Sequence, residues 1–400
     1  MSRWYDTSSL DSNESLPLIG SPSTPQENCR KSRIHTQANY WGCVKHTLSY
    51  ILRFLFWSAG FNRHKSIFTK IYSCTILCIC WYQVVYEIAR NSGHLNFVEN
   101  KNTSDITTNQ KLENASFLTS AFGTAFSYTF MYICLMIMYK PSSNSITPYA
   151  ALRDMGNTKA RIILFTWLFF SCIFVGYILI YVYIHGSEIN HHSTLVNLIK
   201  YFSETTEYLA QWVATVSMFA FSCSAFAIGT FASDTFRRIK SLNGGSIDSV
   251  ITIHKELRAI VTETTNAFSF WFLLHWLLYG ITVIIGFVVV ALHKLGHSET
   301  DKKIYFGTFF AINVFSFVYP CICAAYITTA CAAIPSRINN TISADWHEGH
   351  IFKERKELQL FVSYCAASPV CFKIGRITFT STLAWFSFFF GSTGLLFHFF

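Results

Sequence analysis

Long apolar runs separated by polar segments dominate this 400-residue chain. Seven runs are long enough to cross a hydrocarbon core as helices, which takes about 20 apolar residues. They cover residues 71–89, 117–139, 162–184, 209–232, 268–292, 304–333 and 377–400. A shorter run, 50–61, contains Arg53 and is predicted to lie in the membrane interface or to re-enter; it would form an eighth span only if Arg53 were paired. The pattern predicts an all-α integral membrane protein, a bundle of seven transmembrane helices.

Loops on one side of these spans are rich in Lys and Arg, and loops on the other side are poor in them. The rich loops are 140–161, 233–267 and 334–376, and the poor loops are 90–116, 185–208 and 293–303. Cytosolic loops retain positive charge, so the N-terminus is predicted to be cytosolic and the C-terminus extracellular.

Glycosylation sequons give a second view of the orientation, because they are used only where the chain faces the secretory lumen. Asn102 and Asn114 begin sequons in the first loop assigned outside, and we predict glycans there. Asn13 and Asn339 begin sequons in segments assigned inside. The start of the chain is rich in Ser, Pro, Asn and Asp, so residues 1–49 are predicted to be a disordered cytosolic tail, and residues 50–400 the transmembrane domain.

Two loops assigned to the cytosol are predicted to hold helices. Ser246 is a candidate N-cap for an amphipathic helix that continues into the fifth span. Its apolar positions are Ile247, Val250, Leu257 and Val261. In the second loop, Leu358, Phe361 and Tyr364 recur at helical spacing before Pro369. Such apolar faces must be buried against each other or against another subunit, and we expect contacts with neighbouring subunits.

Composition argues against several classes of function. The chain is 51% apolar and only 13% charged, and its net charge of +9 is spread over the loops, so no nucleic-acid partner is expected. The spans contain almost no ionisable residues, which disfavours a carrier or pump. The sequence at 347–350, His-Glu-Gly-His, has the wrong spacing for a zinc motif and is predicted to be a solvated turn. We therefore predict no enzyme activity, no catalytic residues, no cofactor and no bound metal.

Aromatic residues are unusually frequent, with 39 Phe, 20 Tyr and 10 Trp. Tyr177, Tyr181, Trp212 and Asn313, in the outer halves of the third, fourth and sixth spans, are predicted to line a ligand pocket. Such a pocket is mostly apolar, with a few polar groups that orient a small molecule. Packing is the commoner role for any one of these side chains. His275, the main ionisable residue within a span, is predicted to hydrogen-bond to a neighbouring helix.

The last apolar run combines small and hydroxylated residues with a very apolar end. That composition suits close helix packing, and it suits equally a wetted pore wall with an apolar constriction. Helical spacing would place one set of residues toward such a pore: Ser381, Trp385, Phe388, Ser392, Leu395 and Phe399. Pro320 is expected to kink the sixth span.

Three segments resemble the insect gustatory and odorant receptor superfamily, particularly the gustatory-receptor-like proteins of nematodes and other invertebrates. They are 50–55 with Gly60-Phe61, 257–271, and 357–361 with Pro369 and Phe372. The signature of the superfamily's last span is Thr-Tyr, five apolar residues and Gln-Phe. Gly391 and Ser392 stand where Thr-Tyr is expected, so the resemblance is to a divergent member.

This resemblance implies a sensory receptor of the plasma membrane, of the gustatory type, that is its own ligand-gated cation channel. Four subunits, identical or different, would join through the cytosolic helices within membrane lipid, the last span would line the pore, and a small-molecule ligand would enter the outer pocket. A few invertebrate members respond to light or peroxide. A G-protein-coupled chemoreceptor, which needs the opposite orientation, and a multipass protein with a structural or trafficking role remain alternatives.

Overall fold

The computed structural model describes residues 50–61, 67–92, 108–140, 146–151, 157–185, 194–242, 246–295, 300–340 and 351–399, except Leu52 and Tyr149. All of them belong to one unit, Thr47–Phe400. The predicted disordered tail, 1–49, and the predicted turn at 347–350 lie outside the described residues.

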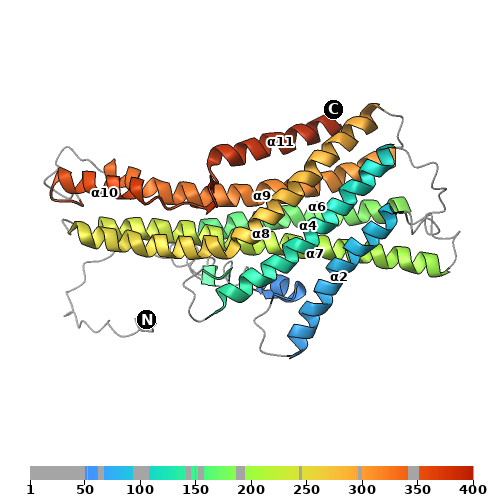
Figure 1. Ribbon diagram of the computed structural model, residues 1–400, viewed down its shortest axis with the longest axis horizontal. Helices are drawn as coiled ribbons and strands as arrows, with labels where there is room; N and C mark the ends of the chain where they lie inside the picture. The colour runs from blue at the N-terminus through green and yellow to red at the C-terminus, as the bar shows by residue number, and fades with distance from the viewer. Residues whose placement is uncertain are drawn as a thin grey trace, which may run out of the picture. The chain divides into compact units, whose positions relative to one another are not determined.

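Helices form nearly all of the described structure (Figure 1). The six longest are α2 (Ile67–Asn91), α4 (Thr108–Met138), α6 (Asn157–His185), α7 (Thr194–Lys240), α8 (Ile247–Leu295) and α9 (Thr300–Asn339). Each is long and apolar enough to cross a membrane, and they coincide with the first six predicted spans. A further helix, α11 (Ser381–Phe399), stands where the seventh span is predicted. The described residues of 50–58 are also helical, with Leu55 and Phe56 buried and Trp57 exposed.

Three of the helices, α7, α8 and α9, have 40 residues or more and are far longer than a membrane crossing requires. α8 has 49 residues, which at 1.5 Å per residue is about 74 Å, whereas a hydrocarbon core is about 30 Å thick. It begins as predicted, because the backbone N–H of Ser249 lies 3.4 Å from Oγ of Ser246, and it runs without a break into the predicted fifth span. α7, with 47 residues, and α9, with 40, extend from the bundle alongside it (Figure 1).

α7 is the central helix and contacts α2, α4, α8 and α9. Along its most apolar stretch 89% of the residues are buried, compared with 28% along the corresponding stretch of α6. Small side chains allow this because they let neighbouring helix backbones approach closely. The buried small residues of α7 include Ala214, Ser217, Ala220, Ser222 and Ala225.

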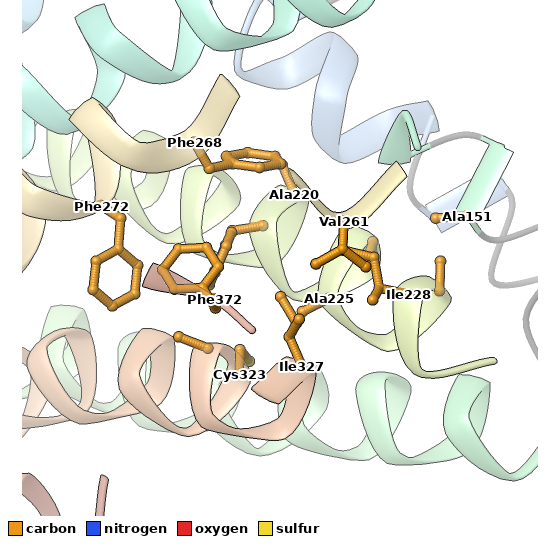
Figure 2. Close-up of a cluster of buried hydrophobic side chains, with 14 of the residues drawn as sticks. Ala151, Ala220, Ala225, Ile228, Val261, Phe268, Phe272, Cys323, Ile327 and Phe372 are labelled. Carbon is orange, nitrogen blue, oxygen red and sulfur yellow. The ribbon is translucent and has the colours of Figure 1, made fainter. Parts of the chain in front are cut away.

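An aromatic cluster joins α8, at the start of its predicted membrane span, to the segment before α11. Figure 2 shows Phe372 beside Phe272 of α8. The ring centroid of Phe372 lies 5.0 Å from that of Phe272 and 5.6 Å from that of Phe221 in α7. The backbone N–H of Phe372 donates to Oγ1 of Thr328 in α9 at 3.1 Å, so this segment is held by three helices.

Phe372 precedes a short antiparallel hairpin formed by β1 (Lys373–Ile374) and β2 (Ile377–Thr378). Gly375 in its turn has φ +59°, a conformation that favours glycine. α11 begins only at Ser381, and the prediction that the last span covers 377–380 is wrong. Ile377 and Thr378 can begin a membrane helix as well as form a strand. The apolar pattern alone therefore does not reveal that they pair with β1.

α10 (Arg355–Ala367) is the second predicted cytosolic helix, and it ends before Pro369 as expected. The ring of His254 in α8 lies 5.8 Å from that of Phe361 and 5.5 Å from that of Tyr364 in α10. Leu257 of α8 and Phe361 are both 0% exposed within the single chain. The expectation that neighbouring subunits cover Leu257 and Phe361 is therefore wrong, because the chain itself buries both side chains. Subunit contacts through the half-buried Ile247 and Tyr364 stay a prediction.

Candidate functional site

Polar side chains from five helices gather at the end of the bundle where α2 and α6 finish and α4, α7 and α9 begin. We call this group the Glu207 cluster. Its members are Gln83, Glu87, Ser120, Tyr177, Thr206, Glu207, Gln211, Tyr305 and Asn313. Most of them are buried, and buried polar groups are costly unless they are hydrogen-bonded.

One part of the Glu207 cluster is built around Tyr177 of α6, which is 0% exposed. Its hydroxyl donates to Oε1 of Glu207 in α7 at 3.4 Å and lies 2.9 Å from the hydroxyl of Tyr305 in α9. The rings of Tyr177 and Tyr305 stack with centroids 5.4 Å apart. These contacts hold three helices together around a carboxyl group.

A second part lies one helical turn further along α7. Nε2 of Gln211 donates to Oγ of Ser120 in α4 at 3.1 Å, and Ser120 donates to Oδ1 of Asn313 in α9 at 3.0 Å. Nδ2 of Asn313 donates to the carbonyl of Phe309 at 2.8 Å. Each donor in this chain has an acceptor, so the network fixes the orientation of both amides.

The third part comes from α2. Oε1 of Gln83 accepts a hydrogen bond from Thr206 of α7 at 2.9 Å, and Nε2 of Gln83 lies 3.5 Å from Oε1 of Glu87. Glu87 forms an ion pair with Arg90 at 3.6 Å. A charged group that is removed from water needs such partners, because without them nothing offsets the free-energy cost of its desolvation.

A narrow cavity lies between α2, α4 and α7 inside this cluster. It is lined by Gln83, Glu87, Phe117, Ser120, Ala121, Thr124, Glu207, Ala210 and Gln211. Its free volume of about 10 Å³ is the space of about one water molecule. A larger guest can enter only if these helices separate.

The predicted pocket residues divide between two places. Tyr177 and Asn313 belong to the Glu207 cluster, whereas Trp212 lies on another side of α7. Its Nε1 donates to Oγ of Ser58 at 3.1 Å, and its ring packs on Trp167 of α6 at 5.3 Å. Trp167 belongs to a second, more apolar cavity between α6, α7 and α9, which Phe170, Phe219 and Phe315 also line. The side chain of Tyr181 lies outside the described residues.

Sequence analysis missed Glu207, Glu87, Ser120 and Gln211. Glu207 and Gln211 are one turn apart on α7, and Gln83 and Glu87 are one turn apart on α2. Polar residues repeated at this spacing on helices that bound a bundle are the signal that could have found them. Glu207 was overlooked because it precedes the apolar run that begins at residue 209.

His275 of α8 is hydrogen-bonded to two neighbouring helices, which confirms the prediction. It is 0% exposed, with Nδ1 lying 3.0 Å from Oγ of Ser127 in α4 and Nε2 lying 2.9 Å from the carbonyl oxygen of Ser316 in α9. Trp271 also donates to Ser127, at 3.1 Å.

α11 packs on α9 through a face of small residues. Ala384, Ser387, Gly391 and Gly394 are buried, and they recur at helical spacing. Ser381, Trp385 and Phe388, from the predicted pore set, lie on exposed positions, and Ser392 is half-buried. The side chains of Leu395 and Phe399 lie outside the described residues, and the pore role of the whole set stays a prediction.

Of the two predicted glycosylation sites, Asn102 lies outside the described residues. Asn114 lies within α4 and is 8% exposed, and its carbonyl accepts a hydrogen bond from Asn91 at 3.3 Å. A glycan there stays a prediction that requires the start of α4 to open.

The chain is a multi-pass membrane protein, since six of its described helices are long and apolar enough to cross a membrane. No protein-family model matches it, and no curated protein matches its sequence. Among solved structures it is similar to the insect olfactory receptor OR5 from Machilis hrabei, with a TM-score of 0.59 and 12% identity, over 91% of this chain and 98% of the receptor. The same receptor in complex with eugenol gives a TM-score of 0.52 and 12% identity, over 88% of this chain and 97% of the receptor. The chain therefore has the fold of an insect olfactory receptor, and the resemblance found in the sequence is confirmed at the level of the fold.

Proposed function

We propose that this protein is a chemosensory receptor of the plasma membrane and a ligand-gated cation channel of the insect odorant and gustatory receptor superfamily. The observation that carries the proposal is the likeness to an olfactory receptor over nearly the full length of both chains. A fold hosts many functions, so the proposal also depends on the Glu207 cluster and on α11.

In the proposed topology, α11 is the seventh span, the N-terminus is cytosolic and the C-terminus is extracellular. The uneven distribution of Lys and Arg supports this orientation. With this orientation the Glu207 cluster lies in the outer half of the membrane, and the extensions of α7, α8 and α9 with α10 lie in the cytosol.

The Glu207 cluster and the apolar cavity on another side of α7 are together the proposed ligand site. The apolar cavity supplies contact area at Trp167 and Phe170, and the cluster supplies carboxyl, hydroxyl and amide groups that orient a ligand. The eugenol complex of the similar receptor supports a small organic molecule as the class of ligand. Because the cavity at Glu207 is narrow, ligand entry would move α7 against α2 and α4.

The proposed pore is lined by α11 in an assembly of four subunits, identical or different. Trp385, Phe386 and Phe389 are 59%, 68% and 62% exposed on the single chain, on the side of α11 away from its small-residue face. Soluble surfaces rarely expose such aromatics, whereas lipid, a neighbouring subunit or a dewetting constriction can accept them.

Purified protein reconstituted into planar lipid bilayers tests the proposal. A panel of small organic molecules that includes eugenol, followed by light and by peroxide, should evoke cation current in at least one arm. Protein carrying Tyr177→Phe serves as a matched control, because it changes the ligand site and leaves α11 intact. Silence under every stimulus, together with a second-messenger response in cells that express the protein, would favour the G-protein-coupled alternative.

A further inference from the structure

α9 continues as a helix through Pro320. In an α-helix the backbone N–H of residue 320 would donate to the carbonyl of residue 316, but proline has no N–H. The carbonyl oxygen of Ser316 therefore lacks its helical partner. Inside a membrane such an orphaned carbonyl is costly, because no water is at hand to hydrogen-bond to it.

His275 supplies the missing donor from α8. Its Nε2 lies 2.9 Å from the carbonyl oxygen of Ser316. A carbonyl oxygen can only accept, so Nε2 carries the proton, and Nδ1 of the neutral ring is then an acceptor. Ser127 of α4 must donate its hydroxyl proton to Nδ1, at 3.0 Å, and its oxygen accepts the Nε1–H of Trp271 at 3.1 Å.

This network lies on α9 between the two proposed functional regions. Asn313, in the Glu207 cluster, precedes Ser316 by one turn. Val314 and Val318, on either side of Ser316, face Gly391 of α11. Residues 313–320 of α9 thus contact the polar cluster, His275 and the last helix within two helical turns.

We infer that Pro320 and His275 act together, as what we call the Pro320–His275 device. Pro320 removes one backbone hydrogen bond of α9, and His275 hydrogen-bonds the freed carbonyl of Ser316 and so links α9 to α8 and α4. While the bond is made, α9 keeps one position relative to both helices. When the bond breaks, α9 can bend at Pro320 and carry α11 with it, because α11 packs on Val314 and Val318. The device itself does not require the chain to be a channel; only its consequence for gating depends on the proposed function.

Coupling between the two residues can be measured by unfolding the purified protein from detergent micelles. His275→Phe keeps a ring of similar size and removes both hydrogen bonds, and it should lower the folded-to-unfolded ratio. Pro320→Ala restores the N–H for Ser316, so the loss caused by His275→Phe should be about fivefold to tenfold smaller in that background. Equal losses in the two backgrounds would overturn the inference.

Pro335 provides a matched control, since it also lies inside α9 but frees the carbonyl of residue 331. His275→Phe and Pro335→Ala should be additive, and a similar coupling there would count against the inference. If His275→Phe does not fold, His275→Gln tests the same point, because its amide can donate to Ser316. The stability loss caused by His275→Gln should then change less on adding Pro320→Ala than the loss caused by His275→Leu. Equal changes would refute the device.

The gating consequence has a separate readout. In bilayers, Pro320→Ala should shift the half-maximal stimulus by severalfold in a protein that still conducts. If the effects of His275→Phe and Pro320→Ala on unfolding are coupled but the parent protein carries no current, the device is supported and the channel is rejected. If the parent protein carries current but the two effects are additive, the channel is supported and the device is rejected.

Discussion

Gly391 of α11 lies so close to Val314 of α9 that a Cβ at position 391 would stand 2.6 Å from Cγ1 of Val314. Real Cβ atoms do not approach that closely, so Gly391→Ala must push α11 away from α9 or move Val314. Overpacking of this kind costs about 1–3 kcal/mol. Alanine gains back about 1 kcal/mol of helix propensity, so we expect Gly391→Ala to lower the free energy of unfolding by up to about 2 kcal/mol and to change the behaviour of any pore that α11 lines.

Gly176 of α6 is the matched control for this substitution. A Cβ there would meet nothing within 4 Å, and alanine favours the helix over glycine by about 1 kcal/mol. Gly176→Ala should therefore be neutral or stabilising in the same unfolding assay. Equal destabilisation by both changes would mean that α11 does not depend on close contact with α9.

Tyr177→Phe should separate ligand recognition from folding. The change removes one hydroxyl, which contacts Tyr305 and Glu207, and keeps the stacked ring. Loss of a buried hydrogen bond costs about 1–3 kcal/mol. If the Glu207 cluster binds ligand, the half-maximal ligand concentration of the protein that reaches the surface should rise about tenfold. A purely structural loss would lower surface expression without shifting that concentration. Tyr201→Phe, at an exposed position of α7, should leave the half-maximal ligand concentration and the surface expression unchanged.

Trp212→Ala should behave differently from Tyr177→Phe. Trp212 packs on Trp167 and donates to Ser58, so its truncation opens a cavity at the contact of α7 with α6 and with the 50–58 helix. Large-to-small changes of aromatic residues cost about 3–5 kcal/mol. Surface expression and response should fall together. A shifted response at normal expression would instead assign Trp212 to the ligand site.

Phe361→Asp should unfold the region around α10 rather than dissociate an assembly. Phe361 is 0% exposed inside its own chain, and an unpaired charge there costs several kcal/mol. Leu360, its neighbour on α10, is 60% exposed, and Leu360→Asp should be tolerated by the fold. Protease sensitivity of the purified variants measures the difference. If Leu360→Asp alone changes migration on a sizing column, the exposed face of α10 is the subunit contact.

The helices themselves could be predicted, because apolar length and caps are local properties. Ser246 and the spacing of Val250, Leu257 and Val261 predicted the start and the buried face of α8. What covers a buried face is not local: the same apolar positions suit an internal partner or another subunit, and only the structure shows α10 over α8. The hairpin at 373–378 was missed because two-residue strands have no periodicity.

The candidate site was predicted only in part for a similar reason. Tyr177 and Asn313 were identified from residue type and depth, but the rotation of α7 decides which residues share a face. Residues 211 and 212 are adjacent in sequence and point to different helices: Gln211 to α4, and Trp212 to α6. Glu87 and Glu207 come from helices distant in sequence, so their meeting across one cavity follows from the fold and from no motif.

The pore assignment of α11 can be tested by cysteine accessibility. Ser392 lies on the predicted pore stripe, whereas Ala384 is buried on the face that packs against the bundle. The exposed thiols of Cys74, Cys78 and Cys172 are first replaced by Ser, so that they do not react. Cysteine at 392 should then react with a charged, membrane-impermeant thiol reagent and change the stimulated current, because a wetted pore admits charge and lipid does not. Cysteine at 384 should stay protected. Phe389, 62% exposed on another side of α11, separates the remaining possibilities. If cysteine at 389 reacts while cysteine at 392 is inert, the predicted pore residues are assigned to the wrong face of α11. If neither reacts in a protein that conducts, α11 faces lipid or a subunit and another helix lines the pore.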